Sequence, residues 1–243
     1  MLEVLVFWLL GAALLLDVSQ RQALVRKPGW EWLLDLSNLL IQGLLIPWLR
    51  LALVWALLAW LWPAGRGLWQ LSDFWGFVLC FVGVDYLYYW NHRLLHQRRL
   101  FPLHLVHHTV TRMDVLATSR NTLWSSLLLV YLWVNGLLLY LSDLNAGFVL
   151  AMSVTACLDM WKHSPFLRER IGLQQALARY LGLMTPLEHA WHHGARLNFN
   201  FGANFNLFDR LHGTYAPAAQ YPERLGVQTR LSRWRLFFFP FQS

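Results

Sequence analysis

Histidines dominate the chemistry that this sequence could perform. Nine of the ten form four short groups: His92-x-x-x-His96, His104-x-x-His107-His108, a lone His163, and His189-x-x-His192-His193. Imidazole is the commonest metal ligand in proteins, and residues three or four apart lie on one face of a helix. Eight imidazoles in three of these groups exceed what one tetrahedral zinc ion can use. The sequence therefore predicts two metal ions.

Two carboxylates and the tenth histidine lie at informative positions. Asp85 precedes His92 by seven residues, on the same helical face. It could accept the outer N–H of a ligating imidazole, or hydrogen-bond a Tyr or Trp of a neighbouring helix. Asp159 precedes His163 by four residues and is a candidate ligand, although an Asp at a helix end more often caps the helix or faces solvent. His212 has no partner at helical spacing, which favours packing or surface exposure over ligation.

Short helices are expected to present these imidazoles. Proline suits the first position of a helix, so Pro102 and Pro186 each begin a turn, with Thr185 as a cap. Each turn would deliver three histidines to half of one site. The alternative, solvated basic residues near a membrane, leaves the spacing unexplained. The Asn198–Gly202 stretch suits a tight loop beside these helices. Neither the HExxH motif of zinc proteases nor a P-loop occurs.

The composition indicates a membrane protein. Of 243 residues, 57% are hydrophobic and only 14% are charged, whereas about a quarter of residues are charged in soluble domains. A spanning helix needs about 20 mostly apolar residues. We expect an all-α bundle of about five spans, at Leu2 to Val18, within Leu36 to Trp62, Phe74 to Trp90, Leu123 to Leu141 and Leu144 to Met160. The second contains Gln42, Pro47 and Arg50, so it is either a kinked span or an interfacial helix followed by a shorter span.

Basic residues give this bundle an orientation. With five spans, 18 of the 20 Lys and Arg residues fall on one side. The positive-inside rule then places the N-terminus outside, and the C-terminus and every histidine in the cytosol. The net charge of +7 is better explained by attraction to anionic lipid than by nucleic acid. Arg112, Arg120 and Lys162 could contact a lipid head group or serve only to set the topology.

We expect one domain over residues 1–243. Residues 1–72 would anchor it, residues 73–160 would carry the first two histidine groups, and residues 161–243 would form a cytosolic cap. The start of the chain has Glu3 in place of a basic residue and no small-residue cleavage site, so it is expected to be a retained anchor. Cys80 and Cys157 lie in predicted spans and are expected to be inert thiols.

From about Asp73 to Pro222 the chain resembles the fatty acid hydroxylase/sterol desaturase superfamily of integral membrane enzymes. The segment from Asp85 to His96 is similar to the family's first histidine box, His104-Leu-Val-His-His108 to the second, and His189-Ala-Trp-His-His193 to the third. His163-Ser164 resembles an isolated pair in the family. Asn200-Phe-Gly202 and Asp209-Arg-Leu211 with Gly213-Thr-Tyr215 match its closing pattern, in which an aromatic residue usually stands where this chain has His212.

The resemblance implies two iron ions, although zinc could replace them on isolation. It also implies O2 as co-substrate and electrons from a separate protein of ferredoxin or cytochrome type. The metal ligands would be His92, His96, His104, His107, His108, His163, His189, His192 and His193. The substrate would be a lipid, either hydroxylated or desaturated. Similar enzymes act on sterols, acyl chains, ceramides, carotenoids, alkylglycerols and aldehydes, so the family does not select one. The sequence also leaves open a membrane-embedded zinc hydrolase and a metal transporter or sensor.

Overall fold

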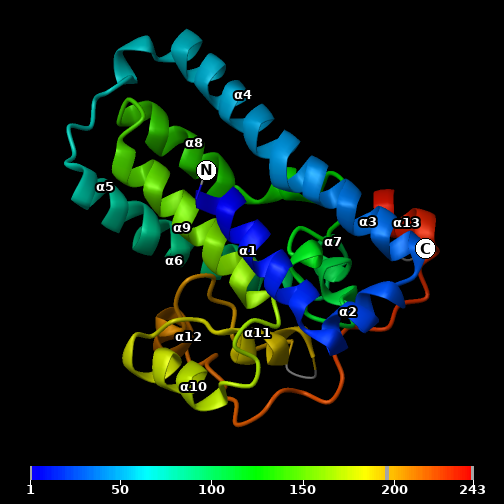
Figure 1. The fold of residues 1–243 in the computed structure, drawn as a ribbon. Helices are drawn as coiled ribbons and strands as arrows, with labels where there is room; N and C mark the ends of the chain where they lie inside the picture. The colour runs from blue at the N-terminus through cyan, green and yellow to red at the C-terminus, as the bar shows by residue number, and fades with distance from the viewer. Residues whose placement is uncertain (1, 195–196, 242–243) are drawn as a thin grey trace.

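The computed structural model describes residues 2–194 and 197–241. That part of the chain is helical and contains no strand, only an isolated bridge between Leu183 and Phe205. The all-α prediction is therefore confirmed. An upper bundle and a lower cap make up the fold (Figure 1). The bundle helices are α1 (Leu2–Leu16), α3 (Gly29–Leu40), α4 (Ile46–Leu61), α5 (Asp73–Val78), α6 (Asp85–Leu95), α8 (Val130–Leu141) and α9 (Ala146–Lys162). The cap helices are α10 (Ile171–Tyr180), α11 (Pro186–His193) and α12 (Leu207–Leu211).

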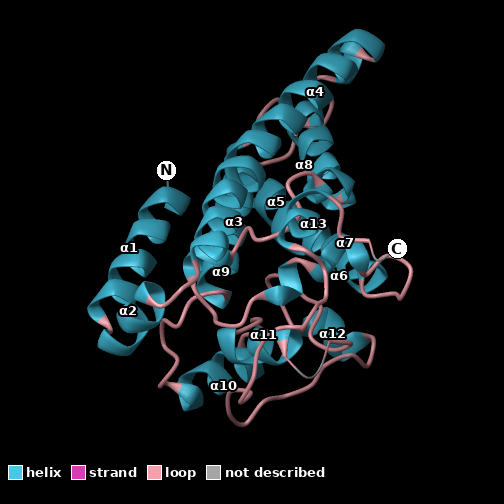
Figure 2. Ribbon diagram, turned by 90° about the vertical axis from the view of Figure 1, so that its right-hand side faces the viewer, coloured by secondary structure: helices cyan, strands magenta, loops and turns pink. Residues whose placement is uncertain are grey.

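The first apolar segment ends in a sharp bend. Asp17 follows α1 and caps α2 (Val18–Val25), accepting hydrogen bonds from the amides of Ser19 and Gln20. A capping carboxylate starts a new helix efficiently, and α2 leaves α1 at 95°. In Figure 2 this pair stands to one side of the bundle.

The second apolar segment is one continuous helix. A π turn, Ile41–Leu45, joins α3 to α4, so the helix runs without a break over 33 residues from Gly29 to Leu61. Pro47 follows this wide turn. A proline removes one helical hydrogen bond and crowds the preceding turn, and a π turn accommodates such a disturbance. The alternative of two separate helices is therefore wrong.

The third segment is also continuous, from α5 through the π turn Leu79–Val84 into α6. Its upper end packs closely on α9. Gly147 makes this approach possible, because a Cβ atom there would lie 1.8 Å from the carbonyl oxygen of Asp73. The direct consequence is that α6 ends beside the C-terminal end of α9, and both helices end in histidines.

The predicted fourth segment is helical only in its second half. Residues Ser125–Leu128 form a 3-10 turn, and α8 begins at Val130. Its 12 residues extend about 18 Å. In the described part of the chain, Gly29–Leu61 alone is long and apolar enough to cross a membrane, and α1 with α2 would add a second span if the bent pair counts as one. All five predicted segments contain helices, but five spans are not confirmed.

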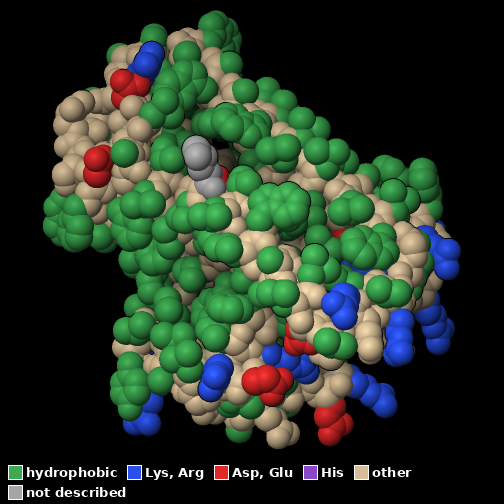
Figure 3. Space-filling view, viewed as in Figure 1, with side chains coloured by type: hydrophobic (Ala, Val, Ile, Leu, Met, Phe, Trp, Pro, Cys, Tyr) green, Lys and Arg blue, Asp and Glu red, His purple; other side chains and the backbone are tan. Residues whose placement is uncertain are grey.

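Charge separates the two ends of the molecule. Hydrophobic side chains cover the upper helices, and most visible Lys and Arg side chains gather around the lower part (Figure 3). At the other end Arg66 forms an exposed ion pair with Asp143, with 2.8 Å between the two groups. The structure thus reproduces the asymmetry on which the predicted orientation depends, while the orientation itself stays a prediction.

Candidate metal centre

Nine histidines converge where the bundle meets the cap, and they form two groups. We call the first the five-histidine group; it consists of His92, His96, His104, His108 and His192. We call the second the four-histidine group; it consists of His107, His163, His189 and His193. Within each group, one nitrogen of every imidazole lies within 4.8 Å of the others. The structure thus brings together all nine histidines that the sequence singled out.

The two groups divide each HxxHH motif between them. His104 and His108 enter the five-histidine group, while His107 enters the other. In α11, which carries His189, His192 and His193, residues four apart differ by only about 40° in direction, whereas adjacent residues differ by about 100°. The pair at i and i+4 therefore points one way and the histidine at i+3 points another. The same division separates His192 from His189 and His193.

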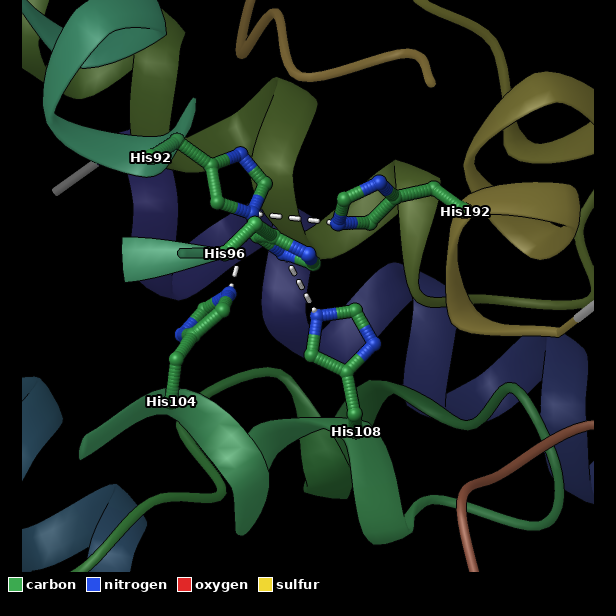
Figure 4. Close-up of side chains that lie close together, drawn as sticks. All are labelled: His92, His96, His104, His108 and His192. Atoms are coloured by element: carbon green, nitrogen blue, oxygen red, sulfur yellow. Dashed lines mark hydrogen bonds between the residues drawn. The ribbon is translucent and has the colours of Figure 1, made fainter. Parts of the chain in front are cut away.

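The five-histidine group carries the strongest indication of a bound cation (Figure 4). His92 Nδ1 lies 2.7 Å from the carbonyl oxygen of Phe201, and His192 Nδ1 lies 2.7 Å from that of Phe199. A neutral imidazole has only one N–H, so these bonds leave a lone pair on each Nε2. The two Nε2 atoms are nevertheless only 3.1 Å apart. Facing lone pairs at this distance require a cation between them.

The distances fit a metal ion. His92 Nε2 also lies 2.9 Å from His104 Nε2, and His96 Nε2 lies 3.1 Å from His108 Nε2. Two nitrogens bound at right angles to one metal, each about 2.1 Å from it, would be about 3 Å apart. All candidate donors are nitrogens, which suits iron, zinc and copper rather than magnesium or calcium.

The four-histidine group shows the same pattern. His163 Nδ1 lies 2.8 Å from the carbonyl oxygen of Asp159, and His107 Nδ1 lies 3.2 Å from that of Arg120. Their Nε2 atoms are thereby directed inward. His163 Nε2 lies 3.0 Å from His189 Nε2, which is itself 3.1 Å from His193 Nε2. Backbone carbonyls that fix the imidazoles in this way are typical of metal sites.

Burial keeps these imidazoles neutral. It lowers the pKa of His107 and of His192 to about 3, and lowers the pKa of His163 as well. Close packing of several imidazoles adds to the effect, because each protonated ring would repel the others. Neutral imidazole is the form that binds a metal ion. At physiological pH the cluster is therefore ready to coordinate cations.

A polar loop of the cap supplies the carbonyls of Phe199 and Phe201. Asp209 holds this loop by accepting hydrogen bonds of 2.8 Å from the amides of Phe201 and Gly202. Gly202 has no alternative, because a Cβ atom there would lie 1.9 Å from the carbonyl oxygen of Phe205. The predicted tight loop is confirmed.

Asp85 acts on the same loop. Its carboxylate accepts hydrogen bonds from the amides of Asn204 and Phe205, at 2.9 and 3.2 Å. No imidazole in the described residues donates to it, so both sequence-based expectations, an imidazole and a Tyr or Trp partner, are wrong. The cap folds back onto α6, and two amides of its loop donate to the two oxygens of this buried carboxylate. Asp85 therefore positions the loop that in turn orients His92.

Asp159 and His212 do not join either group. The Asp159 carboxylate lies 3.3 Å from the Lys162 ammonium and 3.7 Å from His163 Nδ1, whose closer partner is the backbone carbonyl oxygen of Asp159 at 2.8 Å. His212 Nε2 lies 3.2 Å from the Tyr86 hydroxyl, and its ring also contacts Tyr89 and Trp90. The candidate ligand role of Asp159 is not supported, and His212 has the packing role that its spacing favoured.

Charged residues also support the site from outside the histidine boxes. Arg120 is 2% exposed and binds Asp35 and Glu31 of α3, with contacts from 2.5 to 3.0 Å. Lys27 is paired with Asp35 and Asp114 in the same cluster. These ion pairs fix the position of Arg120, and so of its backbone carbonyl oxygen, which lies 3.2 Å from His107 Nδ1.

The residues proposed for a lipid head group are therefore already engaged. Arg120 and Lys162 are buried and paired. Arg112 binds Asp114 and the carbonyl oxygen of Ala23. These pairs favour the topological role for Arg120 and Lys162. Arg112 keeps a side chain that is 24% exposed and an Nε without a hydrogen-bond partner, so its contact with a head group stays a prediction.

Sequence reasoning missed Arg120, Asp209 and the α3 carboxylates as supports of the site. Asp209 had one signal, since it belongs to the closing Asp-Arg-Leu pattern. No sequence motif pointed to Asp35 and Glu31, because their partner Arg120 lies 85 and 89 residues away in the chain. Polar residues within an apolar helix were the available hint.

Comparison with known proteins agrees with this geometry. The family model for fatty acid hydroxylase matches residues 77–214, which contain all nine clustered histidines. This chain belongs to the fatty acid hydroxylase family. The N-terminal 76 residues, including the α3 carboxylates behind Arg120, lie outside the matched region of the family.

Two curated relatives of this chain are named as enzymes that act on lipids. An alkylglycerol monooxygenase from Danio rerio is 28% identical over 59% of this chain and 31% of its own length. Ornithine lipid hydroxylase OlsE from Rhizobium tropici is 31% identical over 57% of this chain and 41% of its own length. The chain therefore covers well under half of these relatives. No solved structure matches it.

Proposed function

We propose that this fatty acid hydroxylase family member is a membrane-bound, O2-dependent enzyme that hydroxylates an unactivated C–H bond of a lipid with two iron ions. The observation that carries the proposal is the pair of all-nitrogen groups lying side by side, with His92 and His192 presenting facing lone pairs. When bound, the iron ions would supply the activation of O2. The balance requires two electrons and two protons for each O2, giving one alcohol and one water.

The protein residues would orient the metal ligands and exclude water from the site. Backbone carbonyls orient the imidazoles, and Asp85 and Asp209 hold the loop that carries two of these carbonyls. Buried apolar side chains of the π turn Leu79–Val84, of α8 and of α9 pack together in the bundle, among them Val84, Leu138 and Phe148. This apolar layer suits an alkyl chain that enters from the bilayer.

Hydroxylation is favoured over desaturation, because the relatives are named as a monooxygenase and a hydroxylase. The charge asymmetry supports a cytosolic position for the histidines, with a separate electron-transfer protein docking on that side. We propose the same orientation as the sequence predicted, with the N-terminus outside.

Isotope incorporation tests the proposal. The purified, iron-loaded protein is incubated with mixed lipids, a chemical or ferredoxin reductant, and 18O2. Lipid mass spectrometry should find products that carry one 18O atom, and these should be absent with His192→Ala. Product formation under strict anaerobiosis, with oxygen from water, would instead identify the zinc hydrolase. The variant His212→Ala is a matched control, because this histidine lies outside both groups.

A further inference from the structure

One buried arginine inside the bundle has no ion-pair partner in the described residues. Arg50 of α4 is only 3% exposed. Its Nε makes a long hydrogen bond of 3.4 Å to the carbonyl oxygen of Ile46, and its Nη1 has no hydrogen-bond partner. No carboxylate of the described chain forms an ion pair with it. Every other deeply buried Lys or Arg in that part of the chain, namely Lys27, Arg120 and Lys162, is paired with an acid.

Such a residue requires a ligand. Arginine stays protonated in proteins, and an unpaired charge buried away from water is strongly unfavourable. Charged residues within membrane helices accordingly mark functional sites in most cases. The missing group must carry negative charge or a strong acceptor oxygen.

The position of Arg50 connects it to the metal centre. Helix α4 packs against α8, where the side chain of Val54 lies against Gly136. One turn earlier on each helix this packing places Arg50 near Tyr131, at the start of α8, and the two side chains interact electrostatically. The Tyr131 ring lies 4.9 Å from the Tyr88 ring, which in turn lies 5.2 Å from the His92 ring. The Val130 amide is bonded to the side chain of Asn91, so α8 begins at the level where α6 reaches the histidines.

The two tyrosines are also unsatisfied. Both rings are partly exposed, and neither hydroxyl makes a hydrogen bond within the described residues. Arg50 of α4, without an ion-pair partner, and the hydroxyls of Tyr131 in α8 and Tyr88 in α6, without hydrogen-bond partners, therefore lead by successive contacts to His92. The Asp159 carboxylate interacts electrostatically with both tyrosines but is itself paired with Lys162, and it forms no ion pair with Arg50.

We propose that Arg50, Tyr131 and Tyr88 form the subsite for an oxyanion, a carboxylate or phosphate, on the lipid substrate. Arg50 binds the anionic oxygen, and the tyrosine hydroxyls donate to the polar atoms that follow it. This subsite deepens and rests on the proposed function, since it assigns the substrate to anionic lipids. It would hold the polar end of the lipid beside the five-histidine group, so that carbons close to that end are oxidised.

Binding without turnover tests the subsite. The protein in non-ionic detergent, without reductant or O2, is titrated with oleate and with oleyl alcohol, which share one alkyl chain. Wild type should bind oleate more tightly than the alcohol. Arg50→Met should weaken oleate binding about 10- to 100-fold and leave the alcohol unchanged, while Arg50→Lys should retain most of the preference. Arg66→Met is the matched control, because Arg66 is exposed at the other end of the bundle.

A second variant keeps the test decisive if Arg50→Met does not fold. Tyr131→Phe should weaken oleate binding about 3- to 10-fold with the alcohol again unaffected. Equal affinity of wild type and both variants for oleate, and likewise for lysophosphatidate, would overturn the subsite. Lysophosphatidate and monoacylglycerol form a second matched pair. Dependence on Arg50 for lysophosphatidate alone would assign the site to a phospholipid and overturn the carboxylate alternative. Because no oxidation occurs in these titrations, intact anion binding with no oxygenated product would reject only the proposed function.

Discussion

The two histidine groups use the same side chain but depend on different parts of the molecule. Carbonyls of the cap loop support the five-histidine group, and Asp209 and Asp85 hold that loop. The four-histidine group is supported by Asp159 of α9 and by Arg120, which is bound to α3. All supports of the first group lie within the matched family region, whereas Arg120 is held by residues outside it. Helix α3, which lies before the matched region, thus shapes the second half of the site.

Removal of one ligand from each group should have the largest effect. His192→Ala and His107→Ala should each lower the bound metal from two ions per chain to one or none, because each deletes a donor from a different group. Elemental analysis of the purified variants measures this, with His212→Ala as control. Full metal content in both variants would show that these histidines are not ligands.

Loss of the loop support should weaken the five-histidine group selectively. Asp209→Asn keeps the shape of the side chain but replaces an acceptor oxygen with an amide that cannot accept the Phe201 or Gly202 N–H. Changes of this kind behind metal ligands cost about 10–100-fold in affinity. Chelator titration should show one weakened ion and one unchanged ion. The exposed variant Asp143→Asn should behave as wild type, and equal weakening of both ions would contradict separate support.

Loss of the α3 contacts should give the opposite selectivity with a smaller effect. Glu31→Gln weakens the hold on Arg120 while leaving Asp35 in place. The four-histidine group should then lose about 10-fold in metal affinity, at the lower limit for indirect supports. Asp35→Asn should act in the same direction and also destabilise the fold, because it is buried between Lys27 and Arg120. Unchanged affinity in both variants would limit α3 to an anchoring role.

Acid should destabilise the metal-free protein. The folded-state pKa values of His107 and His192 are about 3, below the ordinary histidine value of about 6.5. The unfolded chain therefore binds more protons than the folded chain between these limits, so stability falls as the pH decreases from about 6.5 towards 3. Raised carboxyl pKa values at Glu188 and at Asp209, the latter about 6, act in the opposite direction but involve fewer groups. Thermal unfolding of the apoprotein between pH 8 and pH 5 measures the balance, and a melting temperature that rises on acidification would contradict it.

Local sequence patterns predicted which histidines form the site but not how they divide into two groups. Spacing identified the nine histidines, and Pro102 and Pro186 marked the starts of the short helices that carry His104 and the third box. The sequence analysis treated each HxxHH motif as a unit, whereas the structure divides it. Helical spacing separates the histidine at i+3 from the pair at i and i+4, but which group each one joins depends on how α6, α9 and α11 meet in space. Gln42 illustrates the same limit. It looked like an anomaly in a span, but its side chain binds Ser126 and the carbonyl oxygen of Thr122.

The metal content of the purified wild-type protein is the most direct test of the two-metal centre. Elemental analysis combined with X-ray absorption at the metal edge should find two transition-metal ions per chain, surrounded by imidazole nitrogens at about 2.0–2.2 Å. A protein that folds and yet retains no metal, or a single ion held mainly by oxygen or sulfur, would contradict the central claim that the facing imidazoles form a two-metal centre.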